Sequence, residues 1–142
     1  MNSLKSTFLI ITLVISSITN AQSIVGKWKT IDDETGKPKS IVEIFLEDGK
    51  AYGKIIKLFR EKGQNPAPLC DECTDHRKGK KVLGMTIITG MKKDDNEWED
   101  GEILDPNNGK VYDCKLWVED DNLMVRGYIA FFYRTQTWIR VN

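Results

Sequence analysis

The segment PLCDECTDH, residues 68–76, holds the side chains of this sequence that are best suited to chemistry. Cys70, Cys73 and His76 follow one another at intervals of three residues. Thiols and an imidazole at such spacing can bind zinc, the two thiols can act as a redox pair, or they can be oxidised to a disulfide that fixes a loop. The choice depends on the compartment of the protein and on the elements around the segment.

The start of the chain has the pattern of a secretory signal peptide. Lys5 is the only charged residue among the first 21, and it precedes an apolar run over residues 8–18 that is too short to cross a bilayer. Small and polar residues follow, so we place the mature start at Gln22. An uncleaved anchor is the alternative. We expect an exported protein, periplasmic or extracellular, with no transmembrane segment after cleavage.

Residues 22–142 are enough for one domain with a single core. All 21 acidic residues lie in this part, and removal of residues 1–21 takes away one of the 21 basic residues, so the charge stays close to neutral. Both signs are interspersed, and no basic surface of the kind that binds nucleic acid is indicated. We therefore expect no nucleic-acid partner, and no residue pattern points to a cofactor.

Turn-forming clusters of Gly, Pro, Asn and Asp recur along the mature chain, most clearly at Asp48–Gly49. Between them, apolar and polar residues alternate, and no segment keeps an apolar period of 3.6 residues. Strands joined by tight turns favour a single up-and-down antiparallel β-barrel, all-β, with an interior of about one small ligand. The predicted strands cover residues 24–31, 39–47, 50–59, 81–91, 97–104, 110–118, 122–131 and 134–141.

Export to an oxidising compartment favours the disulfide. Cys114 shares the predicted apolar face of its strand with Tyr112 and Leu116, which suits a buried thiol, so Cys70 and Cys73 are the preferred partners. A bridge from one of them to Cys114 is the alternative. The local bridge would hold the longest predicted loop, residues 60–80.

A zinc site is the sharper alternative, with Cys70, Cys73 and His76 completed by Cys114 or Asp75. The second, well-spaced ligand pair of a structural zinc site is missing from the sequence. A redox role lacks the strand–helix setting that activates such thiols. The disulfide therefore remains our preferred interpretation.

His76 is the only histidine, which restricts hydrolytic mechanisms severely. A serine or cysteine nucleophile would have to use it as the base, and no nucleophile elbow is present. We expect His76 to face solvent in a loop. No catalytic residue is predicted.

Several stretches of the sequence resemble one known family. WEDGEILDPNNGKVY covers residues 98–112, VRGYI residues 125–129 and RTQTWIRV residues 134–141. Together with GKWKT near the start, they are similar to the bacterial secreted family catalogued as domain of unknown function 2147, and the similarity covers nearly the whole mature chain. The resemblance implies a small exported domain with a lipocalin-like β-barrel and no assigned activity.

The barrel ends carry a second resemblance. In lipocalins and related barrels, a Trp near the barrel floor is covered by an Arg from the last strand, because closure brings the first and last strands together. Trp28 on the first predicted strand, with Arg134 and Arg140 on the last, resembles this arrangement.

The final predicted hairpin, VRGYIAFFYRTQTWIRV, offers donors and aromatic rings for a ligand. Arginines would anchor an anion or a carbonyl group and aromatic rings would form the walls, although the same rings could instead be barrel core. We therefore expect non-catalytic binding of a small amphipathic or apolar ligand. The predicted contacts are Trp28, Tyr112, Arg126, Tyr128, Arg134, Gln136 and Trp138.

Two other classes of function stay open. A protein-interaction module of the cell envelope would use the outer barrel surface around Trp117, which the alternation places outward. An envelope enzyme without a recognisable motif would need His76 and a carboxylate to meet in a pocket. The identity of a protein partner is not indicated by the sequence.

Overall fold

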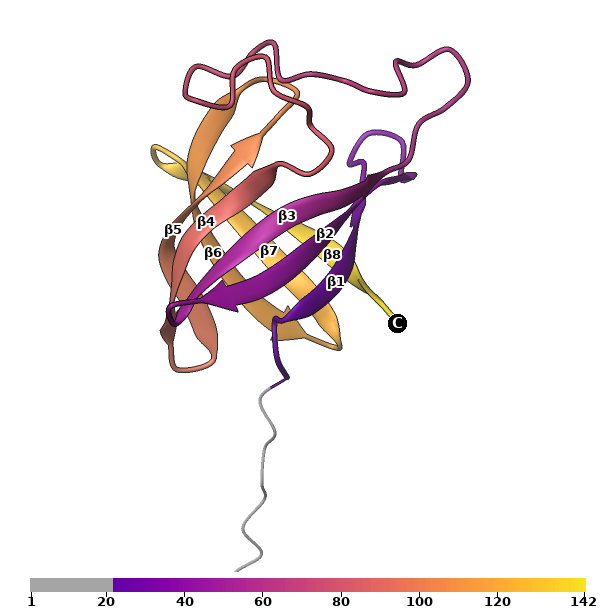
Figure 1. Ribbon diagram of the computed structural model, residues 1–142. Coiled ribbons are helices and arrows are strands. Elements are labelled where there is room, and N and C mark those ends of the chain that lie inside the picture. The colour runs from indigo at the N-terminus through magenta and orange to yellow at the C-terminus, as the bar shows by residue number, and fades with distance from the viewer. Residues whose placement is uncertain (1–21) are drawn as a thin grey trace, which may run out of the picture.

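Eight antiparallel strands form one closed barrel (Figure 1). The computed structural model describes residues 22–142, so the predicted signal peptide, residues 1–21, lies outside the described part. Each strand pairs with the next, and β8 pairs with β1 to close the barrel. The predicted all-β, up-and-down architecture is confirmed. The strands are β1 (Gly26–Ile31), β2 (Pro38–Glu47), β3 (Lys50–Leu58), β4 (Thr86–Asp94), β5 (Glu97–Asp105), β6 (Lys110–Glu119), β7 (Asn122–Ile129) and β8 (Phe132–Val141).

Most strand boundaries agree with the sequence prediction to within two residues, and the larger differences are at β4, which also ends at Asp94 and not at 91, and in the position of the β7–β8 turn. The strand predicted to begin at residue 81 begins at Thr86, because Gly84 has a positive φ and Lys81 instead forms an isolated bridge with Leu69. The turn between β7 and β8, predicted at residues 132–133, lies at residues 130–131. The apolar sequence there contains no Gly, Pro, Asn or Asp to mark the turn.

The connections alternate between two ends of the barrel (Figure 1). One end, which we call the closed end, carries the two-residue turns Asp48–Gly49, Asp95–Asn96 and Asp120–Asp121. Each of these turns has at least one Asp at positive φ, a conformation that Asp adopts more readily than most residues. The other end, the open end, carries the longer loops 32–37, 59–85 and 106–109, and the β7–β8 turn.

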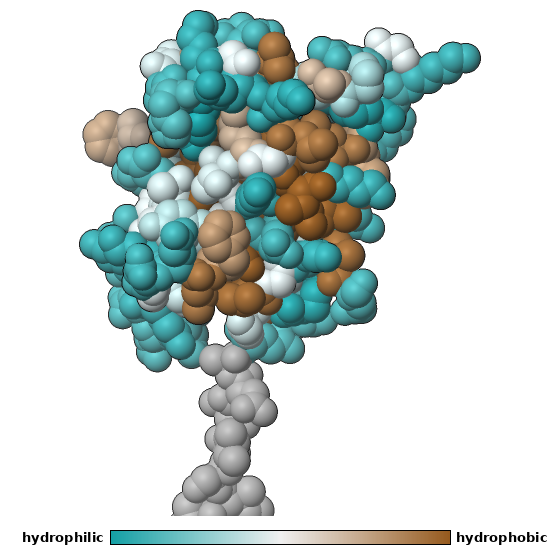
Figure 2. Space-filling model, viewed as in Figure 1, coloured by the Kyte–Doolittle hydropathy of each residue, from teal (hydrophilic) through white to brown (hydrophobic). Residues whose placement is uncertain are grey.

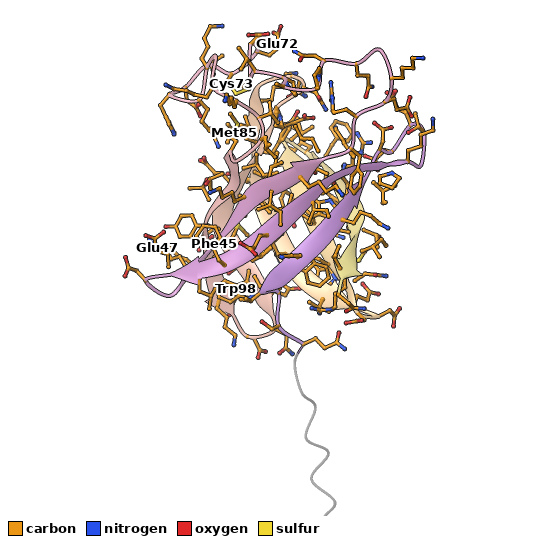
Figure 3. All side chains as sticks on the ribbon, turned by 45° about the vertical axis from the view of Figure 1, so that its right-hand side comes forward. Phe45, Glu47, Glu72, Cys73, Met85 and Trp98 are labelled. Carbon is orange, nitrogen blue, oxygen red and sulfur yellow. A yellow bond between two sulfur atoms is a disulfide. The ribbon has the colours of Figure 1, made fainter. Side chains whose placement is uncertain are left out.

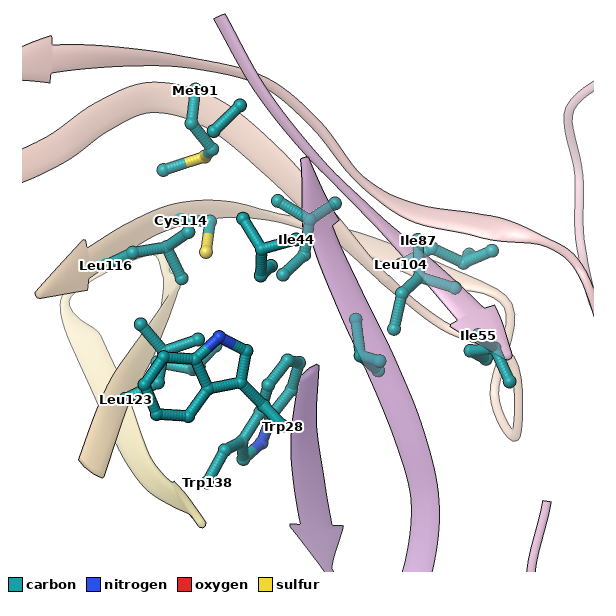
Figure 4. Close-up of a cluster of buried hydrophobic side chains, with 14 of the residues drawn as sticks. Trp28, Ile44, Ile55, Ile87, Met91, Leu104, Cys114, Leu116, Leu123 and Trp138 are labelled. Atoms are coloured by element: carbon teal, nitrogen blue, oxygen red, sulfur yellow. The ribbon is translucent and has the colours of Figure 1, made fainter. Parts of the chain in front are cut away.

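Buried apolar side chains from all eight strands form one core inside the barrel (Figure 4). Trp28, Leu116 and Leu123 are fully buried at the closed end of this core, and the Trp28 indole donates a hydrogen bond to the Ile24 carbonyl over 2.8 Å. The Arg140 guanidinium lies over the Trp28 ring at 4.3 Å. The predicted Trp–Arg contact is thus made by Arg140, which pairs with Trp28 across the β1–β8 seam.

Loop 59–85 extends over the open end and is tied down by the predicted disulfide between Cys70 and Cys73. Both cysteines are fully buried, and Figure 3 places Cys73 and the neighbouring Glu72 at the end of the molecule opposite Trp98. A Cβ atom at Gly109 would collide with the main-chain carbonyl of Glu72. Only glycine therefore lets the β5–β6 turn approach the loop so closely.

Candidate ligand-binding cavity

The open end contains a cavity of about 490 Å³. This volume lies in the range of roughly 300–1,000 Å³ that is typical of small-molecule sites. Its walls come from all eight strands and from three of the four connections at this end, the loops 32–37, 59–85 and 106–109. The residues that line it include Thr30, Asp33, Ser40, Ile55, Leu58, Val82, Ile87, Leu104, Tyr112, Val125, Gly127, Ile129, Arg134, Gln136 and Trp138.

The inner part of the cavity is mostly apolar. Ile55, Ile87, Leu104 and Val125 are buried side chains that line it, and Trp138 contributes an aromatic wall. Figure 4 shows Ile55, Ile87 and Leu104 grouped apart from the cluster around Trp28. An apolar ligand group placed here would therefore move from water onto a largely apolar surface. This removal of apolar surface from water is the main source of affinity in such sites.

A chain of polar groups runs down one wall from the rim. The Asp33 carboxylate, from the β1–β2 loop, accepts hydrogen bonds from Arg134 Nη2 and from Gln136 Nε2, the latter over 2.7 Å. Gln136 Oε1 in turn accepts a hydrogen bond from Trp138 Nε1 over 3.1 Å. Residues 134, 136 and 138 alternate along β8, so they share its inner face. Asp33 thereby neutralises the arginine that faces the cavity.

Two hydroxyl groups add a second polar point. Thr30 Oγ1 and Ser40 Oγ are both buried and lie 2.7 Å apart. Near the rim, the Tyr112 hydroxyl accepts a hydrogen bond from Asn108 Nδ2 over 3.1 Å. Throughout residues 22–142, every buried side-chain nitrogen and oxygen has a hydrogen-bond partner. The polar groups of the wall are therefore satisfied before any ligand enters.

The charges on the rim are mixed, and acidic residues outnumber basic ones among the lining side chains. Hydrogen bonds from the main-chain amides of Thr35 and Glu34 lower the pKa of Asp32, which keeps this carboxylate ionised. Asp105 likewise accepts a hydrogen bond from the Asn107 amide. The basic lining residues are Lys39, Arg60 and Arg134. Arg134 forms an ion pair with Asp33, whereas Lys39 and Arg60 have no ion-pair partner within residues 22–142.

Four predicted contact residues line the cavity, and three do not. Trp28 lies beneath Arg140 in the core at the closed end. Arg126 pairs with Thr135 and Tyr128 with Tyr133, whereas Gln136 pairs with Val125, so Arg126 and Tyr128 project from the outer face of the barrel. The alternation predicted each face correctly, but only closure decides which face is inside. Those that line the cavity are Tyr112, Arg134, Gln136 and Trp138.

The sequence interpretation missed Asp33, Thr30 and Ser40. Asp33 lies in a turn-rich stretch, where a carboxylate is normally explained by local hydrogen bonds to the backbone. Its partners are 101 and 103 residues away in the sequence, at Arg134 and Gln136. No local signal could have revealed this contact, because it depends on closure of the barrel between β1 and β8.

The remaining sequence candidates lie outside the cavity. Cys70 and Cys73 are bonded to each other, so their sulfurs are not available as metal ligands in this state. Cys114 is a buried free thiol whose pKa is raised to about 12 by burial. His76 is exposed in loop 59–85 and is not among the lining residues. Within the described chain, no group of three or more His, Cys, Asp or Glu residues is arranged to hold a metal ion.

Residues 22–142 contain no helix with the length and apolarity needed to cross a bilayer. A search among curated proteins found no relative of this chain. Among solved structures, the fold is similar to protein HP1028 from Helicobacter pylori, described as belonging to the lipocalin family. The TM-score is 0.72 at 19% sequence identity, and the match covers 84% of each chain. This likeness supports a lipocalin-like barrel as the fold.

The family comparison covers most of the barrel. Residues 26–140, from the first residue of β1 to the penultimate residue of β8, match the family described as uncharacterized protein conserved in bacteria, DUF2147. The resemblance inferred from the stretches around Trp98–Tyr112 and Arg134–Val141 is thereby confirmed. The chain belongs to the bacterial DUF2147 family and has a lipocalin-like β-barrel.

Proposed function

We propose that the barrel binds a small amphipathic or apolar molecule in its open-end cavity and does not turn it over. The observation that carries this proposal is the cavity of about 490 Å³ with an apolar inner part and a few polar groups on one wall. Tyr112, Arg134, Gln136 and Trp138 are the proposed ligand contacts. The lipocalin-like fold supports the proposal, since barrels of this size commonly enclose one small ligand.

The charges of the wall favour a neutral polar head group over an anionic one. Arg134 already has the Asp33 carboxylate as its partner, and the other lining charges are more often acidic than basic. A hydroxyl, carbonyl or amide group could exchange hydrogen bonds with Gln136 or with the Thr30–Ser40 pair without burying an unpaired charge. A carboxylate that bound at Arg134 would first have to displace Asp33.

Cavity binding is tested with N-phenyl-1-naphthylamine, an uncharged apolar probe that fluoresces when it leaves water. Gly127 lines the cavity, and a Cβ there would meet its nearest neighbour, Tyr112 Cβ, only at 3.6 Å. Gly127→Leu should fold and fill space, weakening probe binding by roughly tenfold or more, because the probe loses the volume it needs. Thr137→Leu, on the exposed face of β8, is the matched control and should bind normally.

Head-group preference is tested by displacing this probe with monolauroylglycerol or laurate, which share one acyl chain. We expect the neutral glycerol ester to compete better with the wild-type protein. Asp33→Asn should shift the preference toward laurate, since it frees the Arg134 guanidinium for a carboxylate. Equal binding of the probe by the wild type and Gly127→Leu would refute cavity binding itself, whereas stronger competition by laurate in the wild type would refute only the neutral head group.

Export is part of the proposal. It is supported by the signal-like pattern of residues 1–21 and by a buried disulfide, which persists in oxidising compartments. Mass spectrometry of the protein recovered from its own cells should find a chain that begins at or near Gln22 with Cys70 and Cys73 oxidised. A full-length chain in the cytoplasmic fraction would contradict this location.

A further inference from the structure

The tip of the β7–β8 hairpin exposes an unbroken apolar run, residues 129–133, at the open end. The exposed fractions are 98% for Phe131, 76% for Phe132 and 62% for Tyr133, and Ile129 is also exposed. In Figure 1 this turn projects sideways from the barrel, and Figure 2 shows a hydrophobic knob at the same place. An exposed apolar run reduces the solubility of a protein, so a surface that retains one normally uses it for an interaction.

The residues at the tip are not the types that favour a tight turn. Ala130 has a φ of 50°, in the left-handed region where a Cβ atom is unfavourable. The three turns of the closed end use Asp or Gly at the same kind of position. Asn or Gly would form the β7–β8 turn with less strain, so the Ala130–Phe131 sequence is better explained by what it contacts.

Polarity rises step by step from the tip toward the barrel wall. Phe131 lies at the tip, and behind it the rings of Tyr128 and Tyr133 pack with their centroids 6.2 Å apart. The Arg126 guanidinium lies next, 4.2 Å from the Tyr133 ring and 4.8 Å from that of Trp117. Phenylalanine, then tyrosine, then arginine is the order that a membrane interface presents with decreasing depth, and Trp117 lies on the far side of the arginine.

We propose that this hairpin docks the open end of the barrel onto a lipid bilayer, with Phe131 and Phe132 inserted among the acyl chains. A protruding tip of five residues is far smaller than the roughly 20–30 residues per side of a specific protein interface. A bilayer requires no matching surface shape. The proposal goes beyond ligand binding and does not depend on it, although docking would place the cavity mouth, which Ile129 also lines, beside the membrane.

The test is flotation of the mature protein with phosphatidylcholine vesicles, with and without 30% phosphatidylglycerol. Phe131→Ser should lower the partition coefficient by roughly tenfold or more, because one large ring no longer leaves water. Phe131→Trp should retain binding. Insertion is apolar, so added salt and the anionic lipid should change wild-type binding little.

Two variants separate docking from folding. Leu46→Ser removes a half-exposed apolar side chain beside a turn of the closed end and should bind vesicles like the wild type. Ala130→Gly removes the Cβ atom that is unfavourable at this positive φ, so it should maintain or raise stability and leave vesicle binding unchanged. Each variant is also titrated with N-phenyl-1-naphthylamine, which should bind unchanged, so that a defect in the cavity is not mistaken for a defect in docking.

Three results would overturn the proposal. Wild-type protein that fails to float with either vesicle would exclude a bilayer as the partner. Binding that requires phosphatidylglycerol and is insensitive to Phe131→Ser would indicate charge attraction at another surface. A wild-type dimer in solution that Phe131→Ser converts to a monomer, without vesicle binding, would make the tip a contact between two copies of the chain.

Discussion

The two ends of the barrel differ in the length of their connections and in how tightly their side chains pack. At the closed end, short Asp-containing turns bring neighbouring strands together over a core that Trp28 and Arg140 seal. At the open end, loop 59–85 extends over the barrel (Figure 1), and this loop and the β1–β2 loop form walls of the cavity. The closed end therefore contributes most of the buried packing that stabilises the fold, whereas the open end is less tightly packed and keeps surface that a ligand can reach.

The two ends also differ in how they are held together. The closed end relies on burial of large apolar side chains, which is spread over many contacts. The open end relies on a few specific constraints, namely the Cys70–Cys73 disulfide, the close approach of Gly109 and the Arg77–Asp75 pair. Damage to the first end should unfold the molecule, while damage to the second should loosen loops and spare the barrel.

The largest effect is expected for Trp28→Ala. Deleting a fully buried indole should lower the free energy of unfolding by about 3–5 kcal/mol, through lost burial and a cavity beneath Arg140. Leu58→Ala, at the end of β3 near the open end, is partly buried and should cost less than about 2 kcal/mol. Urea denaturation measures both, and equal losses would erase the distinction between the ends.

Gly109→Ala should be the most damaging small change at the open end. Its Cβ would strike the Glu72 carbonyl, so we expect a loss of about 2–3 kcal/mol or displacement of loop 59–85. Gly36→Ala is the control, since Gly36 has the same φ of 71° but an added Cβ meets nothing within 4 Å. It should cost about 1 kcal/mol. Thermal unfolding and proteolysis of the loop would reveal the difference, and similar losses would mean that the contact with Glu72 is unimportant.

Replacing Cys70 and Cys73 together by Ser should cost about 2 kcal/mol, the chain-entropy value for so short a loop. The change should appear as faster proteolysis within residues 59–85, while the β-sheet circular dichroism of the barrel persists. Cys114, buried on β6, should stay unreactive toward thiol reagents in this variant. Rapid modification of Cys114 would show that the disulfide supports the barrel as well as the loop.

The smallest effect is expected in acid. Hydrogen bonds from Arg77 lower the pKa of Asp75 from 3.8 to about 2, and Arg77 also donates to the Thr86 carbonyl at the start of β4. Because the folded pKa is lowered, the ionised carboxylate stabilises the loop fully above the unfolded value of 3.8, and this contribution is lost as pH falls through about 2. Solvent exposure of Asp75 keeps the effect small.

Hydrogen exchange of the main-chain amides around residues 78–80 measures this loosening. Asp75→Asn should remove the acid-dependent part of the change and leave exchange at the closed end unaltered. Acid-induced opening of the same size in Asp75→Asn would assign it to another carboxylate.

Much of the barrel could be predicted from local patterns. The alternation around Cys114 and the Asp-containing turns correctly indicated strands, their faces and their sequential pairing. The β7–β8 turn was misplaced because its apolar residues carry no turn signal. The beginning of β4 was misplaced because a bridge from Lys81 to Leu69 competes with the strand. These two errors lie at the open end, where local preference and final structure disagree, whereas the end of β4 at the closed end differs from the prediction by three residues.

The sequence by itself indicated an all-β chain, its family and a preference for pairing Cys70 with Cys73, since these depend on residue type and short spacing, and the structure then confirmed the pairing. Only the tertiary structure decided which face of β7 lines the cavity and that Asp33 meets Arg134 and Gln136. Alternation with a period of two residues separates the two faces of a strand, but it does not show which face points into the barrel. Closure of β1 onto β8 makes that choice, because it brings together residues that are about a hundred positions apart.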